Sequence, residues 1–196
     1  MFFRTPDTDR RLAKTPHELA MTNLLLFNLS ALIALLGGSF LQADSPLAPY
    51  RLLGVALPLS ISLAIVVYSA VRARRAAASG PWLAAAHWRL ATGRYKVLLI
   101  AYVAGAALIA LGWLLAHTQD KPGMQEMMFI ALQRVAIAPL LIVLMVLVVL
   151  ESGSIYQAQR AEVPDGLVKR FPPPADLPGS DTEPQAALAA DEPAGR

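Results

Sequence analysis

Four stretches of about twenty residues contain almost no charged side chain, and they limit the possible folds more than any other feature of the chain. An α-helix needs about 20 apolar residues to cross the ~30 Å hydrocarbon core of a bilayer. The stretches run from about Ala20 to Leu41, Leu52 to Val71, Val97 to Ala116 and Phe129 to Leu150, and Arg134 is the one charged residue inside them. The pattern predicts an all-α integral membrane protein with a four-helix transmembrane bundle.

The basic residues alternate between the connections. Segment 1–15 has four Lys or Arg, the connection 72–96 has six and the segment 157–196 has four, whereas the two other connections share three. Positively charged segments tend to stay in the cytoplasm, so we expect both termini and the middle connection on that side. The first stretch is too long for the 7–15-residue apolar core of a cleaved signal peptide. With the Ala-, Leu- and Arg-rich composition, this pattern favours the bacterial inner membrane.

Three regions follow from this reading. Residues 1–15 form a cytoplasmic N-terminal segment, and residues 16–156 form the four-span transmembrane domain. From about residue 157 the composition changes to Pro, Ala, Asp and Glu, and five acids follow Arg170. A segment with few apolar residues and no periodicity is predicted to be a disordered cytoplasmic tail.

The stretch Thr15 to Met21, which reads TPHELAM, allows two interpretations. His-Glu with a second His one helical turn later is the zinc-protease signature, but position 21 is Met, so no zinc pair forms. Thr15 followed three residues later by Glu18, with Pro16 between them, is typical of a capping box. We therefore expect the first helix to begin near Pro16.

The connection 72–96 is predicted to be a short amphipathic helix on the membrane surface. Pro81 and Gly93 are typical start and stop signals, and the apolar residues between them recur at helical spacing. Tryptophan favours the interface, and Arg side chains attract anionic headgroups. The residues expected to contact lipid headgroups, or else a partner protein, are Arg72, Arg74, Arg75, Trp82, Trp88 and Arg89.

Three polar residues within the spans are candidates for helix contacts or for a solute path. Asn23 and Asn28 lie in the first span and can hydrogen-bond across helices. Arg134 lies near the start of the fourth span. A charge at membrane depth is costly, so we expect Arg134 to reach the outer edge or to pair with an acid there.

No residue set suggests catalysis, a metal site or a cofactor. The chain has no cysteine, which excludes thiolate chemistry and disulfides. His17 and His87 lie on one side of the membrane and His117 on the other, outside the hydrocarbon, which disfavours haem, and no acid inside the core completes a proton relay. The basic residues flank the spans, so anionic lipid explains them better than nucleic acid does.

These observations favour a non-catalytic integral subunit, or an assembly factor, of a larger inner-membrane complex. It would act through its helix faces and its cytoplasmic connection, with a membrane-protein partner or with other copies of itself. The alternative is a small oligomeric channel or transporter for an ion or small solute, with Asn23, Asn28 and Arg134 along the path.

Overall fold

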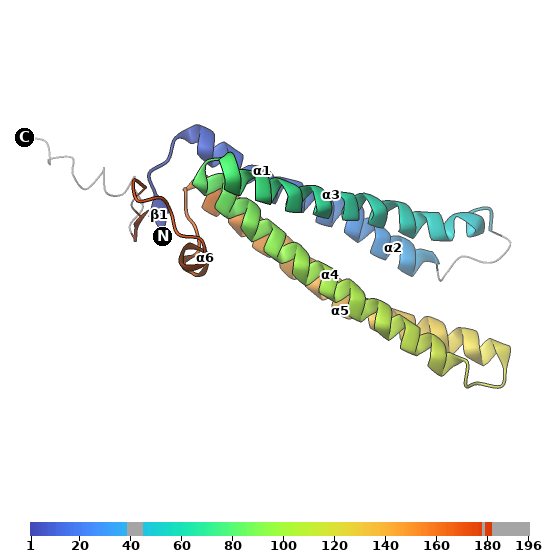
Figure 1. Ribbon diagram of the computed structural model, residues 1–196. Coiled ribbons are helices and arrows are strands. Elements are labelled where there is room, and N and C mark those ends of the chain that lie inside the picture. The colour runs from blue at the N-terminus through green and yellow to red at the C-terminus, as the bar shows by residue number, and fades with distance from the viewer. Residues whose placement is uncertain (39–44, 178, 182–196) are drawn as a thin grey trace, which may run out of the picture. The chain divides into compact units, whose positions relative to one another are not determined.

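The structure is a computed structural model that describes residues 1–38, 45–177 and 179–181. It is mostly helical (Figure 1). The elements are β1 (Phe2–Phe3), α1 (Asp7–Thr22), the π-helix η1 (Asn23–Asn28), α2 (Leu29–Gly38), the 3-10 helix η2 (Ala48–Tyr50), α3 (Arg51–Ser79), α4 (Trp82–Ala116), α5 (Pro122–Gln159), α6 (Asp165–Arg170) and β2 (Gly179–Ser180).

Among the described residues, four helical segments are long and apolar enough to cross a membrane by length and composition. They comprise Asp7–Gly38, Ala48–Ser79, Trp82–Ala116 and Pro122–Gln159. At most 33% of the residues in the most apolar window of each segment are buried. The predicted number of apolar helices is confirmed, and many of their large apolar side chains are exposed.

The chain divides into two compact units. Unit 2 comprises Thr22–Val66 and Arg94–Val149, and it contains the most apolar parts of the four segments. Within it α4 and α5 approach closely: a Cβ atom added to Gly105 would lie 2.5 Å from a Leu140 methyl group. A larger residue at position 105 would require the Leu140 side chain to move, so glycine favours this close contact between helices.

Unit 1 comprises Met1–Met21, Val67–Gly93 and Leu150–Arg196, three segments far apart in the sequence. Its apolar core consists of Phe3, Ala13, Leu83, Ala86, Ala158, Ala161 and Val163. The terminal ammonium group donates hydrogen bonds to the Val163 carbonyl (3.1 Å) and the Asp165 carboxylate (3.0 Å). Strands β1 and β2 pair antiparallel, so the N-terminus lies beside α6 and the segment that follows it (Figure 1).

The first helix begins nine residues earlier than the capping box predicted. Helix α1 starts at Asp7, and Pro16 lies inside it. The Thr15 hydroxyl donates to the Arg11 carbonyl one turn back, and Glu18 pairs with Lys14. The acids Asp7 and Asp9 occupy the first turn, where their negative charges interact favourably with the positive end of the helix dipole.

The connection 72–96 also differs from the prediction. Helix α3 continues to Ser79, and α4 runs without interruption from Trp82 through Gly93 to Ala116. A glycine inside a helix costs only about 1 kcal/mol, which is too little to stop a long helix supported by packing. The separate surface helix is therefore the first part of α4.

The segment after Gln157 is ordered where the structure describes it, in contrast to the predicted disorder. Helix α5 ends at Gln159, Ala161 adopts a φ of 51°, and the buried Val163 leads into α6. The segment 163–171 mixes apolar and basic residues without periodicity. It is ordered because Val163, Leu167, Val168 and Phe171 pack with the core that contains Phe3 and Leu83. Residues 178 and 182–196 of the predicted tail lie outside the described residues.

Candidate functional site

Three titratable side chains from three helices of unit 1 form a buried hydrogen-bonded chain. The Nδ1 atom of His17 on α1 lies 2.5 Å from Oε2 of Glu151 on α5. The Nε2 atom of His17 lies 2.8 Å from Nδ1 of His87 on α4. The two imidazole rings meet edge to face, with centroids 5.1 Å apart. We call these residues the His–His–Glu chain.

The geometry of the chain limits where its hydrogens lie. An ionised carboxylate only accepts hydrogen bonds, so Nδ1 of His17 donates to Glu151. In a neutral His17 the Nε2 atom then accepts from Nδ1 of His87. If His17 carries a second hydrogen, the bond between the imidazoles reverses and His17 donates to His87. The carboxylate thus fixes the orientation of His17, as it does for histidines in acid–base and metal sites.

The His–His–Glu chain is closed to solvent. The exposed fractions of His17 and His87 are 0%, and that of Glu151 is 1%. A general base must come within hydrogen-bond reach of a substrate proton, and a substrate has no access to these atoms here. The chain therefore holds α1, α4 and α5 together, because breaking it would leave a charged or polar group buried without a partner.

Glu151 directly contacts His17, and it follows the predicted fourth span by one residue, so it is not an acid inside the predicted core. All three residues flank predicted spans on the side predicted to be cytoplasmic, which is the one sequence signal for this cluster. Among the described residues no group of three or more His, Asp or Glu side chains is arranged to hold a metal ion.

A second polar cluster lies in unit 2 around Asn28, whose side chain is fully buried. Its amide nitrogen donates to the Asn23 carbonyl at 2.7 Å, and its amide oxygen accepts from Ser62 at 3.2 Å and from Tyr102 at 2.6 Å. These bonds join η1, α3 and α4. The wider π-helical turn changes which way the following side chains point, and Asn28 is the last residue of this π-helix.

Arg134 is the third predicted polar site in the spans. It lies on an exposed face of α5, next to Gln133, which lines a cavity. The structure therefore brings together the two asparagines but does not join Arg134 to them by a described contact.

Several residues predicted to contact headgroups pack inside unit 1. Trp88 is 3% exposed, and the Arg72 guanidinium lies 5.8 Å from the centre of its ring. Trp82 lies between Phe3 and Phe171, with ring centroids 4.7 and 5.9 Å away. The side chains of Arg74 and Arg75 remain exposed near the end of α3.

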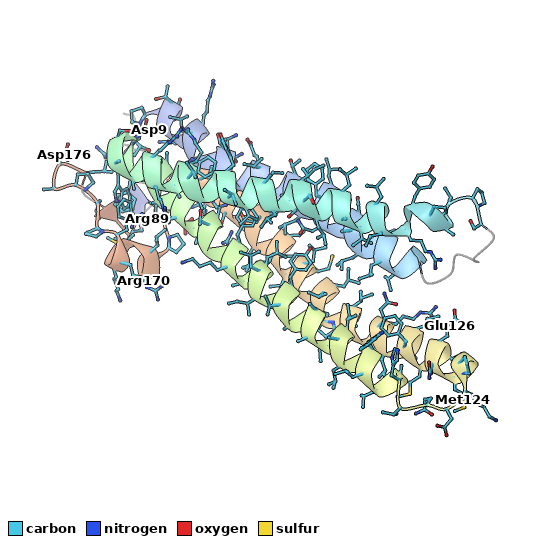
Figure 2. All side chains as sticks on the ribbon, turned by 45° about the vertical axis from the view of Figure 1, so that its right-hand side comes forward. Asp9, Arg89, Met124, Glu126, Arg170 and Asp176 are labelled. Carbon is cyan, nitrogen blue, oxygen red and sulfur yellow. The ribbon has the colours of Figure 1, made fainter. Side chains whose placement is uncertain are left out.

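Arg89 contacts the last ring of this aromatic group. Its guanidinium lies 4.0 Å from the centre of the Phe171 ring, a cation–π contact. Figure 2 shows Arg89 on α4 and Arg170 on α6 in the same part of unit 1. Phe171 follows α6, so this contact ties the C-terminal segment to α4.

Comparison with known proteins gives no match for this chain, whether with protein-family models, with curated sequences or with solved structures. The proposals below therefore depend on the geometry alone.

Proposed function

We propose that the protein is a four-span subunit or assembly factor of a larger complex in the bacterial inner membrane, without catalytic activity of its own. Both termini and the connection between α3 and α4 face the cytoplasm. The transmembrane helices contact lipid and a membrane-protein partner, and the exposed part of unit 1 contacts the partner in the cytoplasm.

The composition of unit 1 supports this orientation. Eleven of the sixteen described Lys and Arg residues belong to unit 1. They come from three separate segments that fold against one another around one core. The gathering of these residues in one unit fits the preference of Lys and Arg for the cytoplasmic side.

The observation that carries the non-catalytic assignment is the internal use of the buried polar groups. His17, His87 and Glu151 are 0–1% exposed and are linked by hydrogen bonds to one another. The Asn28 side chain is hydrogen-bonded to residues of neighbouring helices. These groups stabilise helix contacts, and none of them is open to a substrate. The exposed surface of the apolar helices is instead suited to lipid and to other helices.

Two experiments test the membrane assignment and the orientation. The protein is expected to stay in the membrane pellet after carbonate extraction. A reporter of the kind that is active only in the cytoplasm is expected to be active when it is inserted at Gly80. A soluble protein, or an external reporter at Gly80, would contradict the proposal.

A third experiment tests the subunit role. Purification from native membranes in mild detergent is expected to retain a distinct membrane protein in constant proportion. A matched preparation of a Trp82→Ala variant tests whether unit 1 contributes to that contact. A monodisperse homomer with no companion protein would contradict the subunit role while leaving the membrane assignment intact.

A channel or transporter is a second candidate, and one observation favours it. The Asn23 amide nitrogen is buried without a hydrogen-bond partner among the described residues, within a π-helix. Such turns occur often at functional sites. Solute flux into liposomes that is lost in Asn23→Leu and Arg134→Ala variants would support this candidate, and absence of flux with any tested ion would oppose it.

A further inference from the structure

A cavity of about 460 Å³ lies within unit 2, between α2, the start of α3 and the first third of α5. Its walls are mostly apolar and include Leu35, Val55, Phe129 and Ile130. Three of its other lining residues are polar: Arg51, Glu126 and Gln133. A largely apolar cavity with a few polar groups is typical of a binding site for a small amphipathic molecule.

A second, smaller cavity continues the apolar track. It has a volume of about 150 Å³ and shares Leu35 and Val55 with the first. Its lining extends to Ile109 on α4 and Leu140 on α5, deeper along the helices. Together the two cavities form an apolar path that begins beside Arg51 and Glu126, the arrangement that a polar head with a hydrocarbon tail would fill.

The two charged residues at the mouth have opposite signs. Arg51 is the first residue of α3, and Glu126 is the fifth residue of α5, where Figure 2 labels it. Among the described residues neither side chain takes part in an ion pair within 4.0 Å. The Nε atom of Arg51 donates to the Ala48 carbonyl at 3.2 Å, which holds the guanidinium in place at the start of the helix.

We propose that this cavity binds a zwitterionic glycerophospholipid with a phosphoethanolamine head. The Arg51 guanidinium binds the phosphate, for which its paired N–H groups are well shaped. The Glu126 carboxylate binds the ammonium group, and Gln133 hydrogen-bonds to the glycerol ester region. One acyl chain lies along Leu35 and Val55. The phosphate of an anionic lipid would also bind Arg51, but its headgroup has no ammonium group to bind the Glu126 carboxylate.

The proposal depends on the membrane assignment above but not on the subunit role. Both charged residues lie at helix starts, just before apolar runs, so in a bilayer they would reach the headgroup level. A lipid that seals this opening would connect α2, α3 and α5.

The test uses the full-length protein in detergent and a phosphatidylethanolamine probe with a photoreactive acyl chain. We expect crosslinks within residues 34–38, 51–55 and 126–133. We also expect competition by unlabelled phosphatidylethanolamine at about tenfold lower concentration than by phosphatidylglycerol. In Glu126→Gln the advantage of phosphatidylethanolamine should disappear while labelling remains. In Arg51→Gln both lipids should compete about tenfold less well.

Two neighbouring variants serve as controls, because Asp120→Asn and Lys121→Gln change exposed charges that do not line the cavity. Both should behave as the wild type does. Equal competition by the two lipids in the wild type, or crosslinks mapped outside the cavity, would overturn the proposal. Circular dichroism of each variant separates loss of binding from loss of fold. Release of the protein by carbonate would instead refute the membrane assignment, so the two failures are distinguishable.

Discussion

Removal of the Glu151 side chain tests the role of the His–His–Glu chain. In Glu151→Ala the Nδ1 atom of His17 loses its acceptor at a fully buried position. Breaking a buried, hydrogen-bonded charge pair by removing one partner costs about 3–5 kcal/mol. A chain of this size loses roughly 2–4 °C in Tm for each kcal/mol, so we expect the Tm to fall by roughly 6–20 °C.

Two further variants isolate the cause of that effect. Glu151→Gln keeps the shape and an acceptor oxygen but removes the charge, and since charge-assisted hydrogen bonds are about twice as strong as neutral ones, it should lose about half as much. Glu18→Ala is the matched control on α1. The Glu18 side chain is 57% exposed and pairs with Lys14 at 3.9 Å, a surface pair that contributes at most about 1 kcal/mol.

The assay is thermal unfolding in detergent, followed by circular dichroism at 222 nm for all variants at one pH. The reasoning predicts the order wild type, Glu18→Ala, Glu151→Gln, Glu151→Ala, from most to least stable. If Glu151→Ala and Glu18→Ala unfold at the same temperature, the His–His–Glu chain does not stabilise unit 1. In that case its buried geometry needs another explanation.

Three other outcomes are expected. Phe3→Ala should destabilise unit 1 by about 3–5 kcal/mol, because the ring is 1% exposed and packs on Trp82. Limited proteolysis of the segment after Gln159 should then become faster. An unchanged cleavage rate would contradict this packing. Tyr102→Phe should cost only about 0.6 kcal/mol, the mean for one such bond in a membrane, as a small fall in Tm. Gly105→Leu should disrupt the contact of α4 with α5, seen as aggregation in size-exclusion chromatography, whereas Gly93→Ala, which meets nothing within 4 Å, should leave the profile unchanged.

The four apolar helices could be predicted because lipid crossing imposes a length and a composition that the sequence displays directly. Local signals were less reliable. The Thr15–Glu18 pattern has the spacing of a helix start, but the same residues are compatible with a helix interior when an earlier start at Asp7 exists. Gly93 resembles a stop, but the packing of α4 outweighs the small cost of glycine within it.

The residues after Gln157 and the His–His–Glu chain could not be predicted for a different reason. Their order depends on contacts between residues 70 to 164 positions apart, such as the bond of the N-terminus to Asp165 and that of His17 to His87. Composition and periodicity carry no information about such pairs, because each partner is unremarkable within its own segment. The predicted sidedness of the spans carries some information about these pairs, since it assigns the segments to one face of the membrane.

The proposed sidedness would account for the position of the buried polar chain. The predicted spans begin three residues after His17 and end one residue before Glu151, so both groups lie at the edge of the hydrocarbon in the proposed orientation. At that depth a charged pair needs shielding from lipid, and α4 supplies it with the buried residues Leu83 to Trp88. The N-terminal and C-terminal segments cover the same end through Phe3 and Val163. In the proposed orientation, unit 1 would allow a histidine–carboxylate pair to join helices at the edge of a bilayer, and loss of its cover should weaken that pair.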